Sequence, residues 1–402
     1  MMMKRALFAG LTVMTLSACS LWPQSAETDS LASVERASID VEWQTRIGDG
    51  TGRHVSRLTM VADGDTVFAL DPNGTVAALD LNSGSIQWQV SLEHTITAGL
   101  TVTDEHVFVA TRAGELLALN RDGGDTHWTA PLTSEAVAPA GVDDTQVYVH
   151  TVDGRVTAYD LQNGKQKWSY EAALPVLTVR GTGSPRVLGQ LVVTGFANGK
   201  VIALDRRLGI PRWEKRLAIP EGRSELERLV DIDGTVLLDD QLLYAASYHG
   251  KLAAITPRGE TRWEEDGSSY YSPVMGLGNL YLTLDDSRVR AFDVATGGSV
   301  WLQDALEGRK LGAPVAYDSF LAVTDLEGYL YLMNQVDGSL VGKRLLRPHG
   351  LHINTPNQSE ATNWRRMRGK VFGSRNPLLA TEAGILAYTN DGSVLLLSVS
   401  TD

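Results

Sequence analysis

The chain of 402 residues contains a single cysteine, and after its N-terminus no apolar run is long enough to cross a bilayer. One cysteine excludes an intrachain disulfide, a zinc site built from cysteines and an iron–sulfur cluster. Basic residues are outnumbered, with 36 Lys and Arg against 48 Asp and Glu and a net charge of −12. Such an acidic chain is poorly suited to the phosphate backbone of nucleic acid, so we expect no nucleic-acid partner.

The N-terminus has the form of an export signal. Lys4 and Arg5 precede an apolar stretch, Ala6 to Leu16, that is too short to span a membrane. The next four residues, Leu16 to Cys19, read LSAC and resemble a bacterial lipobox. We therefore predict a lipoprotein signal peptide over residues 1–18.

The cysteine itself is predicted to be the membrane anchor. Lipidation of Cys19 would hold the protein on a membrane without a spanning helix. Ser20 follows it, as in lipoproteins that are sorted to the outer membrane, and the polar stretch that completes residues 19–40 is predicted to be a flexible tether. The alternative is an ordinary secretory signal cut near Ala18, which would leave Cys19 as a free thiol.

A repeat dominates the rest of the chain. It consists of a glycine turn, an alternating apolar strand, a second glycine turn and then tryptophan, and the first glycine and the tryptophan are fourteen residues apart in four copies. Those copies are Asn73–Trp88, Ala113–Trp128, Asp153–Trp168 and Asn198–Trp213. Spacings of about forty residues between successive units suit four short strands each.

Four further copies are altered or incomplete. His249–Trp263 is one residue shorter, Ser287–Trp301 has serine at the first glycine position, Glu327–Gly342 ends in glycine, and Asp391–Ser400 stops before its tryptophan. Trp43, in contrast, has no turn and strand before it. We therefore predict an all-β fold over residues 41–402, an eight-bladed β-propeller with four-stranded blades whose last blade is closed by the N-terminal strand. A seven-bladed ring with one degenerate unit is the alternative.

Two local predictions follow from the repeat. The Asn-Gly and Asp-Gly pairs at the turns favour type I′ hairpins, in which φ is positive at both residues. The seven repeat tryptophans are expected to wedge between adjacent sheets, which leaves only Trp22 and Trp364 outside the repeat.

The motif A-x-D-x-x-x-G-x-x-x-W resembles the docking repeat of pyrroloquinoline-quinone propellers. This raises an alternative function, that of a periplasmic quinoprotein dehydrogenase dependent on the quinone and Ca²⁺. Those enzymes resemble one another in longer chains with a calcium site and commonly a vicinal disulfide, and here a disulfide is impossible and no acidic cluster has calcium-ligand spacing. Serine-hydrolase, zinc-protease and P-loop motifs are also absent. We therefore expect no enzyme, no metal site and no cofactor.

Two loops break the repeat between blades. The first, Ala172–Pro185, contains Leu177, Val179 and Arg180 before a glycine-rich turn. The second, Ile219–Gly234, has Leu226, Leu229 and Val230 at helical spacing, with Glu225, Arg228 and Asp231 expected to face solvent. Apolar residues beside an arginine on exposed loops are typical of interface anchors, although Leu177 and Val179 also fit a strand core.

A third departure is an insertion at 350–376. It carries a basic cluster with one aromatic residue, namely Trp364, Arg365, Arg366, Arg368 and Lys370. Such a cluster is suited to anionic lipid headgroups or an acidic partner, and a solvated loop is the alternative.

Together the lipobox, the eight repeats and the motifs PVLTVRGTGSP and SELERLVDIDG resemble the B-subunit family of the β-barrel assembly machinery (the Bam complex) of Gram-negative outer membranes. This resemblance covers essentially the whole chain. It implies a lipid-anchored outer-membrane protein that faces the periplasm and has no enzymatic activity. It further implies docking on the polypeptide-transport-associated (POTRA) domains of the barrel subunit, and assistance to outer-membrane protein clients as they fold and insert.

The resemblance also implies which residues contact the partner. They fall on Leu177, Val179 and Arg180 in the first motif, and on Asp231, with Asp233 and Arg228 as neighbours, in the second. Val179 stands where leucine is common in the family. The basic insertion is not part of the family pattern.

Overall fold

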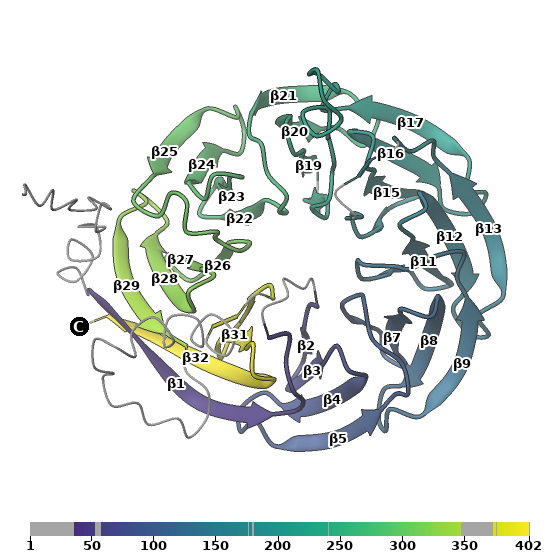
Figure 1. Ribbon diagram of the computed structural model, residues 1–402, viewed down its shortest axis with the longest axis horizontal. Coiled ribbons are helices and arrows are strands. Elements are labelled where there is room, and N and C mark those ends of the chain that lie inside the picture. Colours follow the sequence, from purple (N-terminus) through teal and green to yellow (C-terminus); the bar gives the residue numbers. More distant parts are fainter. Residues whose placement is uncertain are drawn as a thin grey trace, which may run out of the picture. The chain divides into compact units, whose positions relative to one another are not determined.

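The computed structural model describes residues 36–52, 58–175, 177–178, 181–239, 241–346, 373–374 and 376–401. These residues form eight four-stranded antiparallel sheets arranged as the blades of a ring (Figure 1). The eight-bladed propeller is therefore confirmed, and the seven-bladed alternative is wrong. Among the described residues, no helix is long and apolar enough to cross a membrane.

Seven blades are built from strands that are consecutive in the sequence. Blades 1 to 4 are β2 (Val61–Asp63), β3 (Thr66–Leu70), β4 (Thr75–Asp80) and β5 (Ile86–Ser91); β6 (Thr101–Val102), β7 (His106–Thr111), β8 (Glu115–Asn120) and β9 (Thr126–Pro131); β10 (Gly141–Val142), β11 (Gln146–His150), β12 (Arg155–Asp160) and β13 (Gln166–Glu171); and β14 (Arg186–Leu188), β15 (Leu191–Gly195), β16 (Lys200–Asp205) and β17 (Pro211–Arg216). Blades 5 to 7 are β18 (Leu237–Leu238), β19 (Leu243–Ala246), β20 (Lys251–Ile255) and β21 (Thr261–Asp266); β22 (Val274–Gly276), β23 (Asn279–Thr283), β24 (Val289–Asp293) and β25 (Ser299–Gln303); and β26 (Val315–Tyr317), β27 (Phe320–Thr324), β28 (Tyr329–Asn334) and β29 (Leu340–Leu345).

Blade 8 joins the two ends of the propeller. It consists of β30 (Leu379–Thr381), β31 (Gly384–Tyr388), β32 (Ser393–Thr401) and β1 (Ala37–Arg46). In Figure 1 the purple β1 lies beside the yellow β32, and the two strands pair antiparallel along their length. The predicted closure by the N-terminal strand is confirmed. Its start is corrected from residue 41 to Ala37, inside the predicted tether, because Ala37 and Ile39 are buried in the core.

The repeat tryptophans join neighbouring blades, as predicted. Each indole N–H donates to a backbone carbonyl of the next blade at 2.8–3.1 Å. Each ring also covers the second glycine of the next repeat; a Cβ placed on Gly297, for example, would lie 2.6 Å from Cε3 of Trp263. The second glycine of the motif is therefore required by the close approach of the tryptophan as well as by its positive φ.

The first glycine turn differs from the expected type I′ hairpin. In blade 1, Gly74 has φ of 108° and donates its N–H to the carbonyl of Asp71, while Asn73 does not have positive φ. This is the geometry of a type I turn followed by a left-handed glycine. Pro72 at the second position favours that turn, since its ring holds φ near the value that a type I turn needs.

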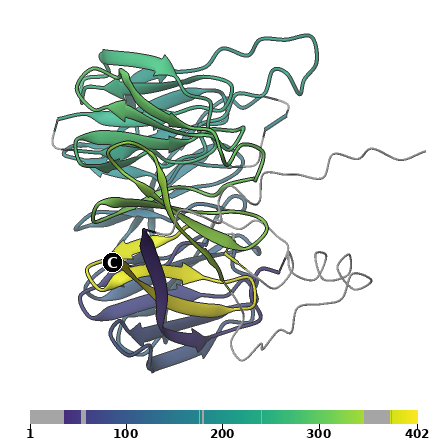
Figure 2. The same ribbon diagram turned by 90° about the vertical axis from the view of Figure 1, so that its left-hand side faces the viewer.

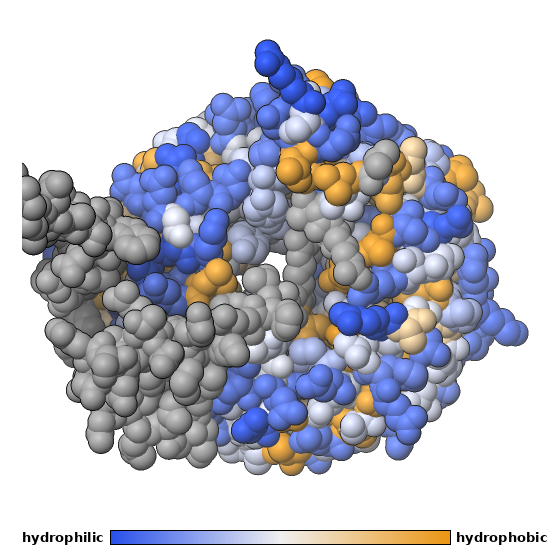
Figure 3. All heavy atoms as spheres, viewed as in Figure 1, coloured by the Kyte–Doolittle hydropathy of each residue, from blue (hydrophilic) through white to orange (hydrophobic). Residues whose placement is uncertain are grey.

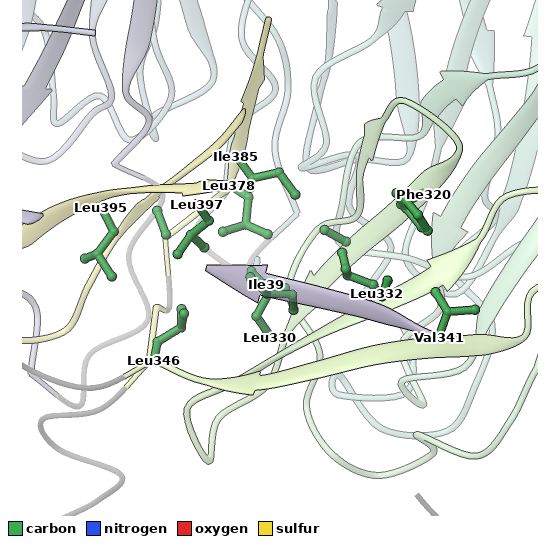
Figure 4. Close-up of a cluster of buried hydrophobic side chains, with 13 residues drawn as sticks. Ile39, Phe320, Leu330, Leu332, Val341, Leu346, Leu378, Ile385, Leu395 and Leu397 are labelled. Carbon is green, nitrogen blue, oxygen red and sulfur yellow. The ribbon is translucent and has the colours of Figure 1, made fainter. Parts of the chain in front are cut away.

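Blade 7 shows why one repeat ends in glycine. The start of β1 crosses blade 7, where the N–H of Arg36 donates to the carbonyl of Val341 at 2.9 Å. A Cβ on Gly342 would lie 2.9 Å from the carbonyl oxygen of Ala37, so a tryptophan there would displace β1. Ile39 of β1 then packs into a cluster shared by blades 7 and 8, with Leu330 and Leu397 among its members (Figure 4).

Candidate partner-binding surface

Both loops that broke the repeat connect the outer strand of one blade to the inner strand of the next. One runs from β13 to β14, between blades 3 and 4, and the other from β17 to β18, between blades 4 and 5. Because outer strands run in the same direction in every blade, the two loops emerge on one face of the ring. In Figure 2 the teal β17–β18 connection projects from that face.

The β13–β14 connection is anchored at its C-terminal end. Thr194 donates its hydroxyl to the carbonyl of Gly183 at 2.7 Å, and Ser184 donates to the carbonyl of Pro139 at 2.7 Å. Before this anchor, Leu177 is 39% exposed. The apolar side chain is therefore presented on the surface, and the alternative that Leu177 is a core residue is wrong. Val179 and Arg180 lie outside the described residues.

The β17–β18 connection contains one capped helical turn. Ser224 Oγ accepts the N–H of Glu227 at 3.2 Å, and the Glu227 carboxylate accepts the N–H groups of Ser224 and Arg223. This reciprocal arrangement is a capping box. The two backbone hydrogen bonds, from Arg223 first and then Ser224, lower the pKa of Glu227. The loop therefore holds a defined conformation although it projects from the ring.

The exposure of individual side chains in this loop differs from the sequence-based expectation. Val230 is buried, and Arg228 is half exposed as expected, 3.6 Å from the carboxylate of Glu225. Leu226 is 69% exposed, as an interface anchor would be, whereas Asp231, which was expected to face solvent, is fully buried. The prediction for Asp231 is wrong because the helical turn ends near Leu229. The chain then runs along blade 5, where the N–H of Tyr248 donates to the carbonyl of Asp231.

The second predicted acid brings the two loops together. Asp233 is 4% exposed, and its carboxylate occupies the space that a Cβ on Gly181 would fill. Gly183 of the first loop likewise lies close to the carbonyl of Gly234 in the second. The structure therefore brings the two motifs together, but the carboxylates of Asp231 and Asp233 lie beneath the surface and not on it.

Two exposed apolar residues extend this surface. Ile219 is 64% exposed and lines a groove of about 570 Å³ beneath the β17–β18 loop, together with Val230, Glu227 and Lys251; Leu226 is exposed on the same loop. Figure 3 shows hydrophobic side chains on this face around the ends of β17 and β20. Ile219 was not among the residues predicted to contact a partner. The signal for it was an isolated apolar residue immediately before the charged stretch of the loop.

Other predicted sites lie outside the described residues. These are Cys19 and the basic cluster of Trp364, Arg365, Arg366, Arg368 and Lys370. Within the described ranges, His, Cys, Asp and Glu form no group of three or more that could hold a metal ion.

Comparisons with known proteins decide the family. A family model described as outer membrane protein assembly factor BamB matches residues 24–95 and 72–303. The BamB of Pseudomonas aeruginosa is 47% identical over 356 residues, which covers 88% of this chain and 90% of that protein. The chain belongs to the BamB family of outer membrane protein assembly factors. The BamB of Escherichia coli is 32% identical and covers 87% of this chain and 93% of its own.

Solved structures agree with this membership. The crystal structure of BamB from Moraxella catarrhalis superposes with a TM-score of 0.76 at 28% identity, covering 90% of this chain and all of that one. A quinohemoprotein alcohol dehydrogenase from Comamonas testosteroni reaches a TM-score of 0.65 at 12% identity, covering 91% of this chain and 77% of its own, which is a likeness of fold alone. With the family comes the location predicted from the lipobox, since the chain is a lipoprotein of the outer membrane that faces the periplasm.

Proposed function

We propose that this chain is a non-catalytic scaffold of outer-membrane protein assembly, which binds POTRA domains of the barrel subunit and thereby assists the folding and insertion of client barrels. The observation that carries the proposal is the joined pair of loops, which present Leu177, Ile219 and Leu226 to solvent over a buried acidic support. Exposed apolar residues grouped on one rigid face are typical of protein-binding surfaces. Membership of the assembly-factor family supports the same function.

The buried acids have a positioning role in this proposal. Asp233 fills the space beside Gly181, so it controls where the first loop can lie. Asp231 is held by its backbone to blade 5, where its carbonyl accepts the N–H of Tyr248 at 2.8 Å. Partner contacts come from Leu177, and from Val179 and Arg180 by their place in the family motif.

The proposal is tested by co-purification of the barrel subunit from solubilised envelopes. We expect the double variant Leu177→Ala, Arg180→Ala to lose the barrel subunit while its circular dichroism spectrum stays unchanged. The matched control is Leu208→Ala. Leu208 is 62% exposed in the β16–β17 hairpin, at the opposite end of β17 from the second loop. Co-purification that survives the double variant contradicts the assignment of this surface.

The positioning role has its own variant. Gly181→Ala places a methyl group where the Asp233 carboxylate lies and should move the first loop. We expect it to weaken co-purification without changing any exposed side chain. If Gly181→Ala binds as well as the native chain, the buried acids do not set the loop position.

The basic cluster at 364–370 is assigned to anionic lipid in this proposal. Five cationic or aromatic residues within seven positions are suited to a negatively charged leaflet surface. Deletion of residues 350–372 should reduce flotation with vesicles that contain anionic lipid at low salt and have little effect at high salt. Equal flotation before and after deletion at low salt contradicts the assignment.

A further inference from the structure

The outer strand of each blade leaves one open edge, and the chain treats one of these edges differently from the rest. Open edges expose backbone N–H and C=O groups that invite pairing, and natural sheets usually protect them with polar or charged side chains. In five blades the two residues that flank the repeat tryptophan are exposed, and all ten are polar or charged. They are Gln87 and Gln89 in β5, His127 and Thr129 in β9, Lys167 and Ser169 in β13, Arg212 and Glu214 in β17, and Arg262 and Glu264 in β21.

Blade 6 is the exception. The equivalent residues of β25 are Val300 and Leu302, which flank Trp301 and are 47% and 45% exposed. In the described part of the chain, β25 is the last strand of its sheet and no strand pairs with its outer edge. Figure 3 shows hydrophobic side chains reaching the rim over β25. The edge therefore lacks the polar side chains that these five blades carry.

Blade 7 shows what covers an apolar edge of this kind. Val341 of β29 occupies the position equivalent to Val300, yet it is only 6% exposed. The extended start of β1 covers it, with a backbone hydrogen bond from Arg36 to the carbonyl of Val341 and with Ala37 and Ile39 in the same apolar cluster. Within this chain, then, an apolar outer strand is matched to an extended segment with alternating apolar side chains.

We infer that the outer edge of β25 binds an extended segment of an unfolded outer-membrane client, in which apolar and polar residues alternate. The inference rests on the proposed function, because transmembrane barrel strands have this alternation. Backbone hydrogen bonds to the edge give affinity that tolerates many sequences, and Val300 and Leu302 select segments with apolar residues at every second position. The site is separate from the loops of blades 3 to 5 that bind the barrel subunit.

The experiment measures fluorescence anisotropy of a labelled twelve-residue peptide in which Val and Leu alternate with Ser and Thr. The double variant Val300→Arg, Leu302→Glu gives β25 the residue types that blade 5 carries at Arg262 and Glu264, so the blade can accommodate them. We expect its affinity for the peptide to fall about tenfold, because two cross-strand apolar contacts are lost. Two control peptides are tested on the native chain: one has the same composition arranged in blocks, and the other is methylated on alternate backbone nitrogens. Each should bind the native chain no more tightly than the alternating peptide binds the Val300→Arg, Leu302→Glu variant.

A gain of binding provides the matched control. The double variant Gln87→Val, Gln89→Leu makes the edge of β5 resemble that of β25 and should create a second peptide site. Near-ultraviolet circular dichroism of the tryptophans checks that each variant keeps its blades packed. Native peptide affinity in a folded Val300→Arg, Leu302→Glu variant overturns the inference.

Testing both variants in both binding assays distinguishes the proposed function from the β25 inference. The Leu177→Ala, Arg180→Ala variant should lose the barrel subunit and keep the peptide, whereas Val300→Arg, Leu302→Glu should do the reverse. If the β25 variant loses the barrel subunit as well, the edge belongs to the partner surface and the inference is wrong. Sedimentation of the native chain gives one more outcome: an assembly that the β25 variant dissociates, with no change in peptide binding, assigns the edge to a second copy and also overturns the inference.

Discussion

At the scale of single residues, the ring depends on a few side chains that cross from one blade to the next. The repeat tryptophans are one set, each bonded to a carbonyl and packed on a glycine of the next blade. Asp71 is another such residue, since its buried carboxylate accepts hydrogen bonds from Tyr388 of blade 8, from the N–H of Gly50 and from the N–H of Asn73. The tryptophan contacts and the Tyr388–Asp71 hydrogen bond join residues of neighbouring blades, so they stabilise the closed ring.

The second glycine of the motif, on which the tryptophan ring packs, can be tested against a glycine that has the same φ but no such contact. Gly297 and Gly278 have φ of 77° and 76°, but a Cβ would meet the Trp263 ring only at Gly297, and at Gly278 nothing lies within 4 Å. We expect Gly278→Ala to cost about 1–2 kcal/mol of unfolding free energy and Gly297→Ala about 2–5 kcal/mol. Urea unfolding followed by tryptophan fluorescence measures both. Equal losses would mean that φ alone requires the glycine.

The hydroxyl of Tyr388 contributes to closure. It donates to Asp71 Oδ2 at 2.6 Å, and burial together with this hydrogen bond raises the pKa of Tyr388. We expect Tyr388→Phe to lower the unfolding free energy by about 1–3 kcal/mol, because a buried carboxylate loses one of its donors. Tyr170→Phe, on a partly buried tyrosine of blade 3, is the control in the same urea series. A Tyr388→Phe variant as stable as the control contradicts a role in closure.

At the scale of an element, four of the outer hairpins have an aspartate at the same position of the repeat, in blades 1, 3, 4 and 6. Asp80 in blade 1 accepts the hydroxyl and the backbone N–H of Ser83, and Asp293 in blade 6 accepts those of Thr296. These hydrogen bonds, the hydroxyl first, lower the pKa of both aspartates below the usual 3.8. The aspartate of the motif therefore stabilises the turn, and we expect this stabilisation to be lost at low pH.

The lowered pKa values predict the direction of the pH dependence. Since the folded pKa lies below the unfolded value of 3.8, the stabilisation is fully present above that pH and is lost as the pH falls through the folded pKa. We expect the double variant Asp80→Asn, Asp293→Asn to lose less stability between pH 5 and about pH 2 than the native chain does. Thermal melting across that range is the measurement, and parallel curves for the two proteins contradict the prediction.

Placing the repeat tryptophan at position 342 of blade 7 should destabilise the propeller. A comparison of the eight units favours tryptophan at position 342, but Gly342 lies under the carbonyl of Ala37, where β1 crosses the blade. We expect Gly342→Trp to displace the start of β1 and lower the thermal midpoint by several degrees, since overpacking of this kind costs about 1–3 kcal/mol. The measurement is differential scanning calorimetry. A raised midpoint would show that the repeat tolerates tryptophan there.

At the scale of the whole molecule, the ring closes only when its two ends meet. β1 pairs with β32 from Ala37 opposite Thr401 to Arg46 opposite Ser393, so the N-terminal strand is part of the last blade. A propeller without this strand would expose the edge of β32 and the apolar face of blade 7 that β1 covers.

Truncation separates the anchor segment from the closing strand. We expect a chain that begins at residue 36 to melt at the temperature of the longer chain, because the residues that pair and pack are retained. A chain that begins at residue 47 should melt at a clearly lower temperature or associate through the open edge of β32. Calorimetry and sedimentation of the two truncated chains measure these outcomes. Equal melting of both contradicts the closure argument.

The number of blades, the closure and the tryptophan positions were predictable because the repeat is local: turn, strand and tryptophan follow one another within sixteen residues. The β17–β18 loop shows where prediction failed. Leu226, Leu229 and Val230 have the spacing of a helix, but after one capped turn the chain pairs with blade 5 and buries Asp231. The contact between residues 231 and 248 forms only when the blades assemble, so the spacing of apolar residues within the loop does not predict it.

The sequence alone determined the strands of the repeat and the number of blades, because both depend on residues that are neighbours along the chain. Only the tertiary structure decided which side chains of the two loops face outward, that Gly342 makes room for β1, and that none of the described strands pairs with the outer edge of β25. These depend on contacts between blades, whose partners are set by ring closure. Burial is a property of the assembled surface, and an apolar residue in an outer strand has the same local pattern whether another strand covers it, as at Val341, or leaves it exposed, as at Val300.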